Sequence, residues 1–161
     1  MTKLYLDSST IVKRYVEENG SGSVASIYNK SDAKELTICF SMWNIGEVIG
    51  AIDRYQRRGW ITENQSSIAL SNLAGETLRL TQIEALELLP LNSFALSETW
   101  DLIRKHHIYQ ADAVQILECK RSRADALLSA DKPLLEVGEN EGLATVDIED
   151  AGQVERQISG K

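Results

Sequence analysis

The sequence has few cysteines and no long apolar run. Its two cysteines, Cys39 and Cys119, lie in apolar stretches, and no second pair supplies a zinc-binding spacing. We expect buried free thiols rather than a disulfide. The opening residues reach Asp7 after three apolar positions, too early for a signal-peptide core, and no apolar run is long enough to span a membrane. The sequence therefore predicts a cytoplasmic protein without a membrane segment.

The motifs of several enzyme classes are also missing. The glycines of the stretch NGSGS follow a predicted helix rather than a strand, and they lack the GxGxxG or GxxxxGK[ST] spacing that cradles nucleotide phosphates. The sequence contains no GxSxG nucleophile elbow, so the adjacent His106 and His107 have no nucleophilic serine of this type to activate. These absences argue against a dehydrogenase, an NTPase and a serine hydrolase.

The net charge of −7 is concentrated near the C-terminus. Seven acidic residues and no lysine or arginine lie between Glu136 and Glu155, so acids and bases balance in the rest of the chain. A basic and aromatic cluster, RYQRRGW, occupies residues 54–60. This cluster can follow a phosphate backbone. Alternatively, it is the solvated end of a helix, where cations complement the helix dipole.

Short apolar runs alternate with helical patterns along 161 residues, a length that fits one compact domain. The predicted strands are residues 4–6, 36–40, 86–91, 126–129 and 143–148. The predicted helices are residues 10–18, 24–28, 42–58, 63–80, 94–105 and 110–121, with one more from Pro133. The stretch TENQ at residues 62–65 has the form of a capping box. This alternation predicts an α/β fold of three layers, with a mainly parallel central sheet between helices.

No linker or repeat divides the chain. We therefore expect one domain over residues 1–148, followed by a polar tail over residues 149–161 that can fray.

An aspartate follows the carboxyl end of two of the predicted strands. Asp7 follows the run KLYL, and Asp131 follows LLSA. Because the carboxyl ends of parallel strands lie at one edge of a sheet, where open α/β folds bind ligands, the two side chains should converge. For each aspartate alone, a helix cap is an equally good interpretation.

A third acid, Glu47, lies on a predicted helix but off its apolar stripe, on a face shared with Trp43, Gly50 and Ala51. No lysine or arginine lies three or four positions away, so an intrahelical ion pair does not explain it. The alternative is an ordinary surface acid.

The fourth acid, Asp112, lies in the first turn of a predicted helix and also has no basic residue three or four positions away. A first-turn anion that complements the helix dipole is the alternative interpretation.

Together, the stretches LYLDSST, WNIGEVIGAI, YQADAVQILEC and LLSADKPLLEVGENEGL resemble the four acidic motifs of the PIN-domain nucleases, in their order. The similarity spans about residues 3–148 and is greatest to the VapC-type toxins of toxin–antitoxin pairs. It implies a PIN-like nuclease domain in which Asp7, Glu47, Asp112 and Asp131 bind metal. It also implies that two hydroxyls, those of Ser9 and Ser129, support these acids at the catalytic site.

The chemistry of the four acids leads to the same kind of site. Carboxylates about 4 Å apart repel by roughly 4 kcal/mol per pair at an effective dielectric of about 20, so four together require a cation. An all-oxygen ligand set selects Mg²⁺ or Mn²⁺, and a bound ion can activate water against a phosphodiester. We therefore predict metal-dependent phosphodiester hydrolysis.

The family resemblance, rather than any residue, implies that RNA is the substrate, that the protein is a homodimer and that a small antitoxin is its partner. The rival hypothesis is a catalytically silent PIN-like module that serves only in protein interactions.

Overall fold

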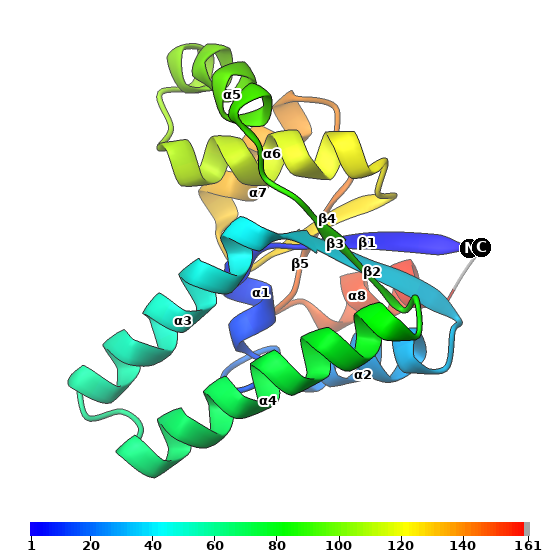
Figure 1. Ribbon diagram of the computed structural model, residues 1–161. Helices are drawn as coiled ribbons and strands as arrows, with labels where there is room; N and C mark the ends of the chain where they lie inside the picture. The colour runs from blue at the N-terminus through cyan, green and yellow to red at the C-terminus, as the bar shows by residue number, and fades with distance from the viewer. Residues whose placement is uncertain (160–161) are drawn as a thin grey trace.

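The computed structural model describes residues 1–159, in which five strands and eight helices alternate (Figure 1). The strands are β1 (Thr2–Leu6), β2 (Leu36–Ser41), β3 (Leu86–Leu89), β4 (Ala126–Ser129) and β5 (Thr145–Asp147). The helices are α1 (Ser8–Val12), α2 (Ser21–Asp32), α3 (Met42–Arg57), α4 (Glu63–Gln82), α5 (Ser93–His106), α6 (Gln110–Ser122), α7 (Lys132–Asn140) and α8 (Ala151–Ile158).

The strands form one sheet in the order β3-β2-β1-β4-β5, and every neighbouring pair is parallel. Helices α6 and α7 lie on one side of the sheet, with α5 outside α6, while α1, α2, α4 and α8 lie on the other side (Figure 1). The predicted three-layer α/β fold with a parallel central sheet is confirmed.

The alternation of side chains along the strands divides the core in two. Leu4 and Leu6 of β1 point into the larger cluster, beneath α1, α2, α3, α4 and α8. Tyr5, between them, points into the smaller cluster with Cys39 and Ile116. Both faces of the central strands are therefore buried, as expected where helices cover both sides of a parallel sheet. Both cysteines are buried and free, as predicted.

Helices α3 and α4 form a hairpin that extends beyond the sheet (Figure 1). Gly59 ends the turn after α3 with a φ of 73°, a conformation that glycine adopts without a steric penalty. The predicted capping box then starts α4: the Gln65 amide donates to Thr62 Oγ1 at 3.2 Å, and the Thr62 amide donates to Gln65 Oε1 at 2.8 Å.

One predicted helix, residues 10–18, was too long. Helix α1 begins at Ser8 and ends at Val12. The carbonyl of Lys13, which a longer helix would bond internally, instead accepts a hydrogen bond from Ser21 Oγ at 2.8 Å. The strands predicted at residues 86–91 and 143–148 are also shorter, ending at Leu89 and covering only Thr145–Asp147.

The expected frayed tail is wrong for the segment after Asp150. Asp150 caps α8 by accepting a hydrogen bond from the Gln153 amide at 3.0 Å. Val154 and Ile158 of this helix are buried in the larger core cluster. Their four-residue spacing gives the polar segment one apolar face, which anchors it to the domain. Residues 160–161 of the expected tail lie outside the described residues.

Within residues 1–159, no helix combines the length and apolarity needed to traverse a lipid bilayer.

Candidate active site

The carboxyl ends of β1 and β4 lie side by side, because Leu6 pairs with Leu128 in a parallel register. Asp7 follows β1 directly, and Asp131 caps the helix that follows β4. Glu47 from α3 and Asp112 from α6 complete the wall of the same cavity, which has a volume of about 300 Å³. Four acids from distant parts of the sequence therefore line one cavity at the edge of the sheet, as the sequence predicted for Asp7 and Asp131.

Asp7 is buried and accepts three hydrogen bonds. Its Oδ1 accepts from Ser9 Oγ at 2.8 Å and from the Thr10 amide at 3.0 Å, and its Oδ2 accepts from Ser129 Oγ at 3.0 Å. Asp7 therefore caps α1, and the same side chain also lines the cavity. Burial nevertheless raises the pKa of Asp7 from 3.8 to about 6, although the hydrogen bonds from Ser9, Thr10 and Ser129 lower it.

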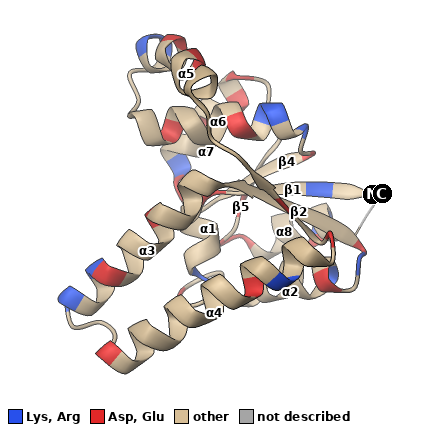
Figure 2. Ribbon diagram, in the orientation of Figure 1, with Lys and Arg blue, Asp and Glu red and all other residues tan. Residues whose placement is uncertain are grey.

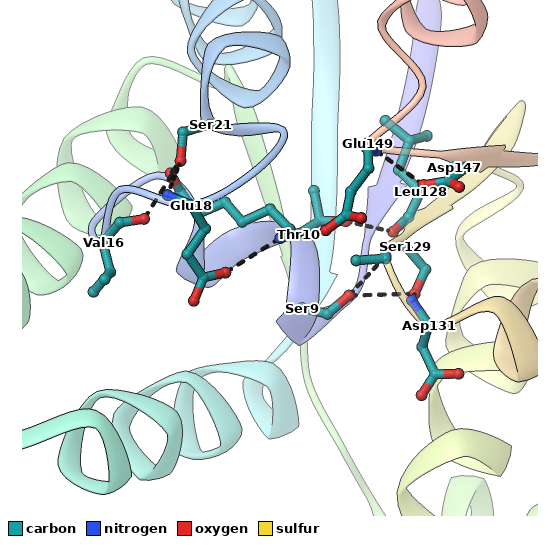
Figure 3. A network of polar contacts seen from close by, with 12 residues as sticks. Ser9, Thr10, Val16, Glu18, Ser21, Leu128, Ser129, Asp131, Asp147 and Glu149 are labelled. Carbon is teal, nitrogen blue, oxygen red and sulfur yellow. Dashed lines mark hydrogen bonds and ion pairs between the residues drawn. The ribbon is translucent and has the colours of Figure 1, made fainter. Parts of the chain in front are cut away.

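Ser9 and Ser129 connect the two aspartates. Their hydroxyl oxygens lie 3.3 Å apart, and Figure 3 shows them beside Asp131. Ser129 Oγ accepts a hydrogen bond from the Asp131 amide at 2.9 Å, and Ser9 Oγ accepts one from the Ala130 amide at 2.8 Å. Each hydroxyl thus donates to Asp7 and holds the backbone that carries Asp131.

Asp131 itself is exposed, and its Oδ1 accepts from the Leu134 amide at 3.1 Å as the cap of α7. The cap interpretation therefore also holds for this residue. Within residues 1–159, no hydrogen-bond donor contacts its Oδ2, so one oxygen is available to the cavity.

Glu47 is half-buried and is held by two side chains from other elements. Ser8 Oγ donates a short hydrogen bond to Glu47 Oε2, and Gln115 Nε2 donates to the same oxygen at 2.7 Å. No cation within residues 1–159 pairs with Glu47, so an ion pair does not account for its position.

The neighbouring acids of the cluster affect the pKa of Asp112. Burial raises its pKa most, and the charges of Asp131 and Glu47 raise it further, while a hydrogen bond from the Tyr109 backbone lowers it. Like charges act on Asp112 from two sides because the three carboxylates face one cavity.

A cation also lines the cavity. Arg54, one turn before the end of α3, lies on the wall with Tyr55. Within residues 1–159 no carboxylate forms an ion pair with Arg54, whereas Arg57 on the same helix pairs with Asp53 at 2.8 Å. Figure 2 shows basic residues toward the end of α3 that lies far from the sheet. The RYQRRGW segment therefore contributes one cation to the site.

The structure is similar to a number of solved structures, among them the following three. PAE2754 from Pyrobaculum aerophilum aligns over 99% of this chain and 97% of its own, with a TM-score of 0.68 and 15% identity. The Mycobacterium tuberculosis toxin VapC20, described as cleaving the sarcin–ricin loop, aligns over 89% and 98%, with a TM-score of 0.62 and 12% identity. FitAcB from Neisseria gonorrhoeae aligns over 91% and 99%, with a TM-score of 0.62 and 12% identity. The chain has the PIN-domain fold. No protein-family model and no curated sequence gives a significant match to it.

The acids of this PIN fold suit a hard divalent ion. Their donor set is entirely oxygen, Asp7 is a buried carboxyl whose pKa is raised, and like charges surround Asp112. No three His, Cys, Asp or Glu side chains within residues 1–159 are placed to hold an ion directly. Mg²⁺ usually keeps several waters and takes only one or two carboxylates from the protein, and the cavity has room for such a hydrated ion.

Sequence reasoning missed two residues that hold Glu47. Ser8 and Gln115 lie within the stretches LYLDSST and YQADAVQILEC, but neither is among the predicted site residues. Gln115 gives one signal that could have found it: it is a polar residue between Val114 and Ile116, three positions after Asp112 and therefore on nearly the same side of the helix.

Proposed function

We propose that this protein is a metal-dependent endoribonuclease that hydrolyses RNA phosphodiester bonds. One observation carries the proposal: four acids from distant parts of the sequence line a single cavity at the carboxyl edge of the sheet. Repulsion among them opposes ionisation of the metal-free site, and the helix caps formed by Asp7 and Asp131 do not explain why Glu47 and Asp112 join them. A divalent cation removes this repulsion.

In this proposal Asp7, Glu47, Asp112 and Asp131 hold Mg²⁺ or Mn²⁺. When bound, such an ion supplies an activated water and neutralises charge that develops on the phosphate. Ser9 and Ser129 orient Asp7 through their hydrogen bonds at 2.8 and 3.0 Å, so they act as positioning residues rather than ligands.

Arg54 is the residue we assign to the phosphate of the substrate. No carboxylate within residues 1–159 pairs with Arg54, so its fork of N–H donors is free, and this fork matches the oxygens of a phosphodiester. Its place on the wall beside the acids puts a cation where the substrate backbone must pass.

The experiment that tests the nuclease proposal is cleavage of a labelled single-stranded RNA by purified protein. We expect cleavage with Mg²⁺ or Mn²⁺, and none in excess EDTA, where circular dichroism should still report a folded chain. A single-stranded DNA of the same sequence tests the choice of RNA, which rests on the resemblance to the VapC-type toxins. Cleavage that persists in excess EDTA contradicts the proposal, and a folded protein that never cleaves favours the silent interaction module.

The similarity to VapC20, described as a cleaving toxin, also supports a role as the toxin of a toxin–antitoxin pair. We propose that the protein is a homodimer that a small antitoxin protein inhibits. Expression of the chain alone should slow the growth of a bacterial host, and co-expression of the product of a small adjacent gene should restore it. Normal growth with abundant folded protein and no copurifying partner contradicts this role.

A further inference from the structure

A buried network of amide and hydroxyl side chains lies beside Glu47, and it reaches the cavity wall at Gln115 and Ser8. Asn44 from α3, Gln115 from α6 and Tyr5 from β1 are its buried members, and at most 3% of any of them is exposed. Buried polar groups are costly unless they are hydrogen-bonded, so a network of this size in the core calls for an explanation.

The amide donors and acceptors of the network can be assigned in only one way. The Ser41 amide can only donate, and it does so to Asn44 Oδ1 at 2.8 Å, so the Asn44 amide group must turn its Nδ2 the other way. Asn44 Nδ2 donates to Gln115 Oε1 at 2.8 Å and to Ser8 Oγ at 3.0 Å. The Asn44 side chain therefore sets the orientation of both groups that approach Glu47.

Both groups then donate to the same carboxylate oxygen. Because Gln115 Oε1 is the acceptor for Asn44, Gln115 Nε2 is left to donate to Glu47 Oε2 at 2.7 Å. Ser8 accepts from Asn44 and donates to the same Oε2. Within residues 1–159, no hydrogen-bond donor contacts Glu47 Oε1.

We propose that Gln115 is a positioning residue for Glu47, oriented by Asn44 and acting together with Ser8. The two donors fix Oε2 and leave Oε1 free for an ion or its water. This inference rests on the proposed function, because it assigns Glu47 a ligand role that requires one fixed orientation. Removal of a group that holds a metal ligand by a hydrogen bond typically changes metal affinity or activity by about 10- to 100-fold.

Tyr5 provides a matched control within the same network. Its hydroxyl lies 3.0 Å from Gln115 Oε1 and 3.2 Å from Asn44 Oδ1, and it has one proton for these two acceptors. Each acceptor keeps another donor without Tyr5, namely Asn44 Nδ2 for Gln115 and the Ser41 amide for Asn44. Loss of this hydroxyl should lower the melting temperature but leave the donors to Glu47 in place.

The test measures Mn²⁺ affinity by electron paramagnetic resonance titration for wild type, Gln115→Met, Ser8→Ala and Tyr5→Phe. We expect the first two variants to bind Mn²⁺ about 10-fold or more weakly, and Tyr5→Phe to stay within about 2-fold of wild type. RNA cleavage should show a lower kcat with little change in KM for Gln115→Met. Ser8 is only partly buried, so Ser8→Ala tests the proposal even if Gln115→Met does not fold.

Unchanged Mn²⁺ affinity in both Gln115→Met and Ser8→Ala overturns the positioning role, as does an equal loss in Tyr5→Phe, which would indicate a general effect of core packing. These outcomes differ from failure of the proposed function, in which the wild-type protein itself neither binds Mn²⁺ nor cleaves RNA.

Discussion

The hydroxyl of Ser129 lies 3.0 Å from Oδ2 of Asp7, although 122 positions separate the two residues in the sequence. This hydrogen bond joins the ends of two neighbouring parallel strands, β1 and β4. It holds a buried carboxylate at the edge of the sheet where the other three acids gather. The fold thus keeps in place a charged group that burial disfavours, which has measurable consequences for stability.

The first prediction concerns Asp7→Asn in the metal-free protein. Burial raises the folded-state pKa of Asp7 from 3.8 to about 6, so the folded state binds more protons than the unfolded state between these values. Stability contributed by this group therefore falls as pH rises from about 4 to 6, by about 3 kcal/mol, and stays low above that range. In EDTA at pH 7.5, Asp7→Asn should melt about 5 °C or more above wild type.

The difference between Asp7→Asn and wild type should close below about pH 4, where Asp7 is protonated in both states. Asp53→Asn is the control, because it makes the same substitution at an exposed acid. Scanning calorimetry from pH 3.5 to 8 checks the prediction. A variant that melts at or below the wild-type temperature at pH 7.5 is the contrary result.

The second prediction compares two arginines of α3. Arg54→Gln should raise the KM for RNA by about 10-fold with little change in kcat, because it removes a phosphate contact outside the reacting bond. It should also reduce the salt dependence of RNA binding. Arg57→Gln should stay near wild type, because Arg57 is exposed and already paired with Asp53. Steady-state kinetics at two salt concentrations tests this prediction. If the two substitutions have equal effects, Arg54 does not bind the substrate phosphate.

The third prediction concerns Glu141, which follows α7. Hydrogen bonds from Lys105, Lys120 and His106 lower its pKa to about 2. Since the folded pKa is depressed, its contribution to stability is complete above about pH 4.5 and is lost as pH falls toward 2. Glu141→Gln should therefore lower stability at pH 7 by about 1 kcal/mol, a modest value because Lys105 and Lys120 can be hydrated.

The melting temperature of Glu141→Gln should fall by about 2–4 °C at pH 7, and the difference from wild type should shrink as pH approaches 2.5. Glu136→Gln, at an exposed position of α7, is the matched control. A difference that is constant with pH would assign the effect to packing instead of charge.

Much of the site could be predicted because strand ends and helix faces obey simple geometry. Asp7 and Asp131 follow apolar runs, and parallel strands must bring such positions to one edge of the sheet. Glu47 and Asp112 were recognisable as acids without a basic partner on their own helices, and the structure places both in the same cavity.

What could not be predicted depends on contacts between distant elements. The role of Gln115 requires that α6 packs across β1 toward α3, and nothing local distinguishes its amide from any other polar side chain. Likewise, Val154 and Ile158 are only two apolar residues in a polar segment, so the burial of α8 became evident only when the core that receives it was known.

The last prediction separates Glu47 from an ordinary surface acid by comparing two substitutions on α3, Glu47→Gln and Asp53→Asn. Glu47→Gln should lower the rate of RNA cleavage by about 100-fold or more, equivalent to about 2.7 kcal/mol of barrier, because an amide is a poor ligand for a hard ion. Folding should be retained, since the side-chain oxygen of glutamine can still accept from Ser8 and Gln115. Removal of one like charge from the cluster can even stabilise the metal-free protein.

Asp53→Asn removes one charge at nearly constant volume from the same helix, and its partner is the exposed Arg57 at 2.8 Å. An exposed i, i+4 pair contributes only a few tenths of a kcal/mol, so both cleavage and melting temperature should stay near wild type. Single-turnover cleavage at saturating Mg²⁺ compares the two variants without interference from product release. If they cleave at the same rate, Glu47 is not a ligand, and the group of four acids loses its member from α3.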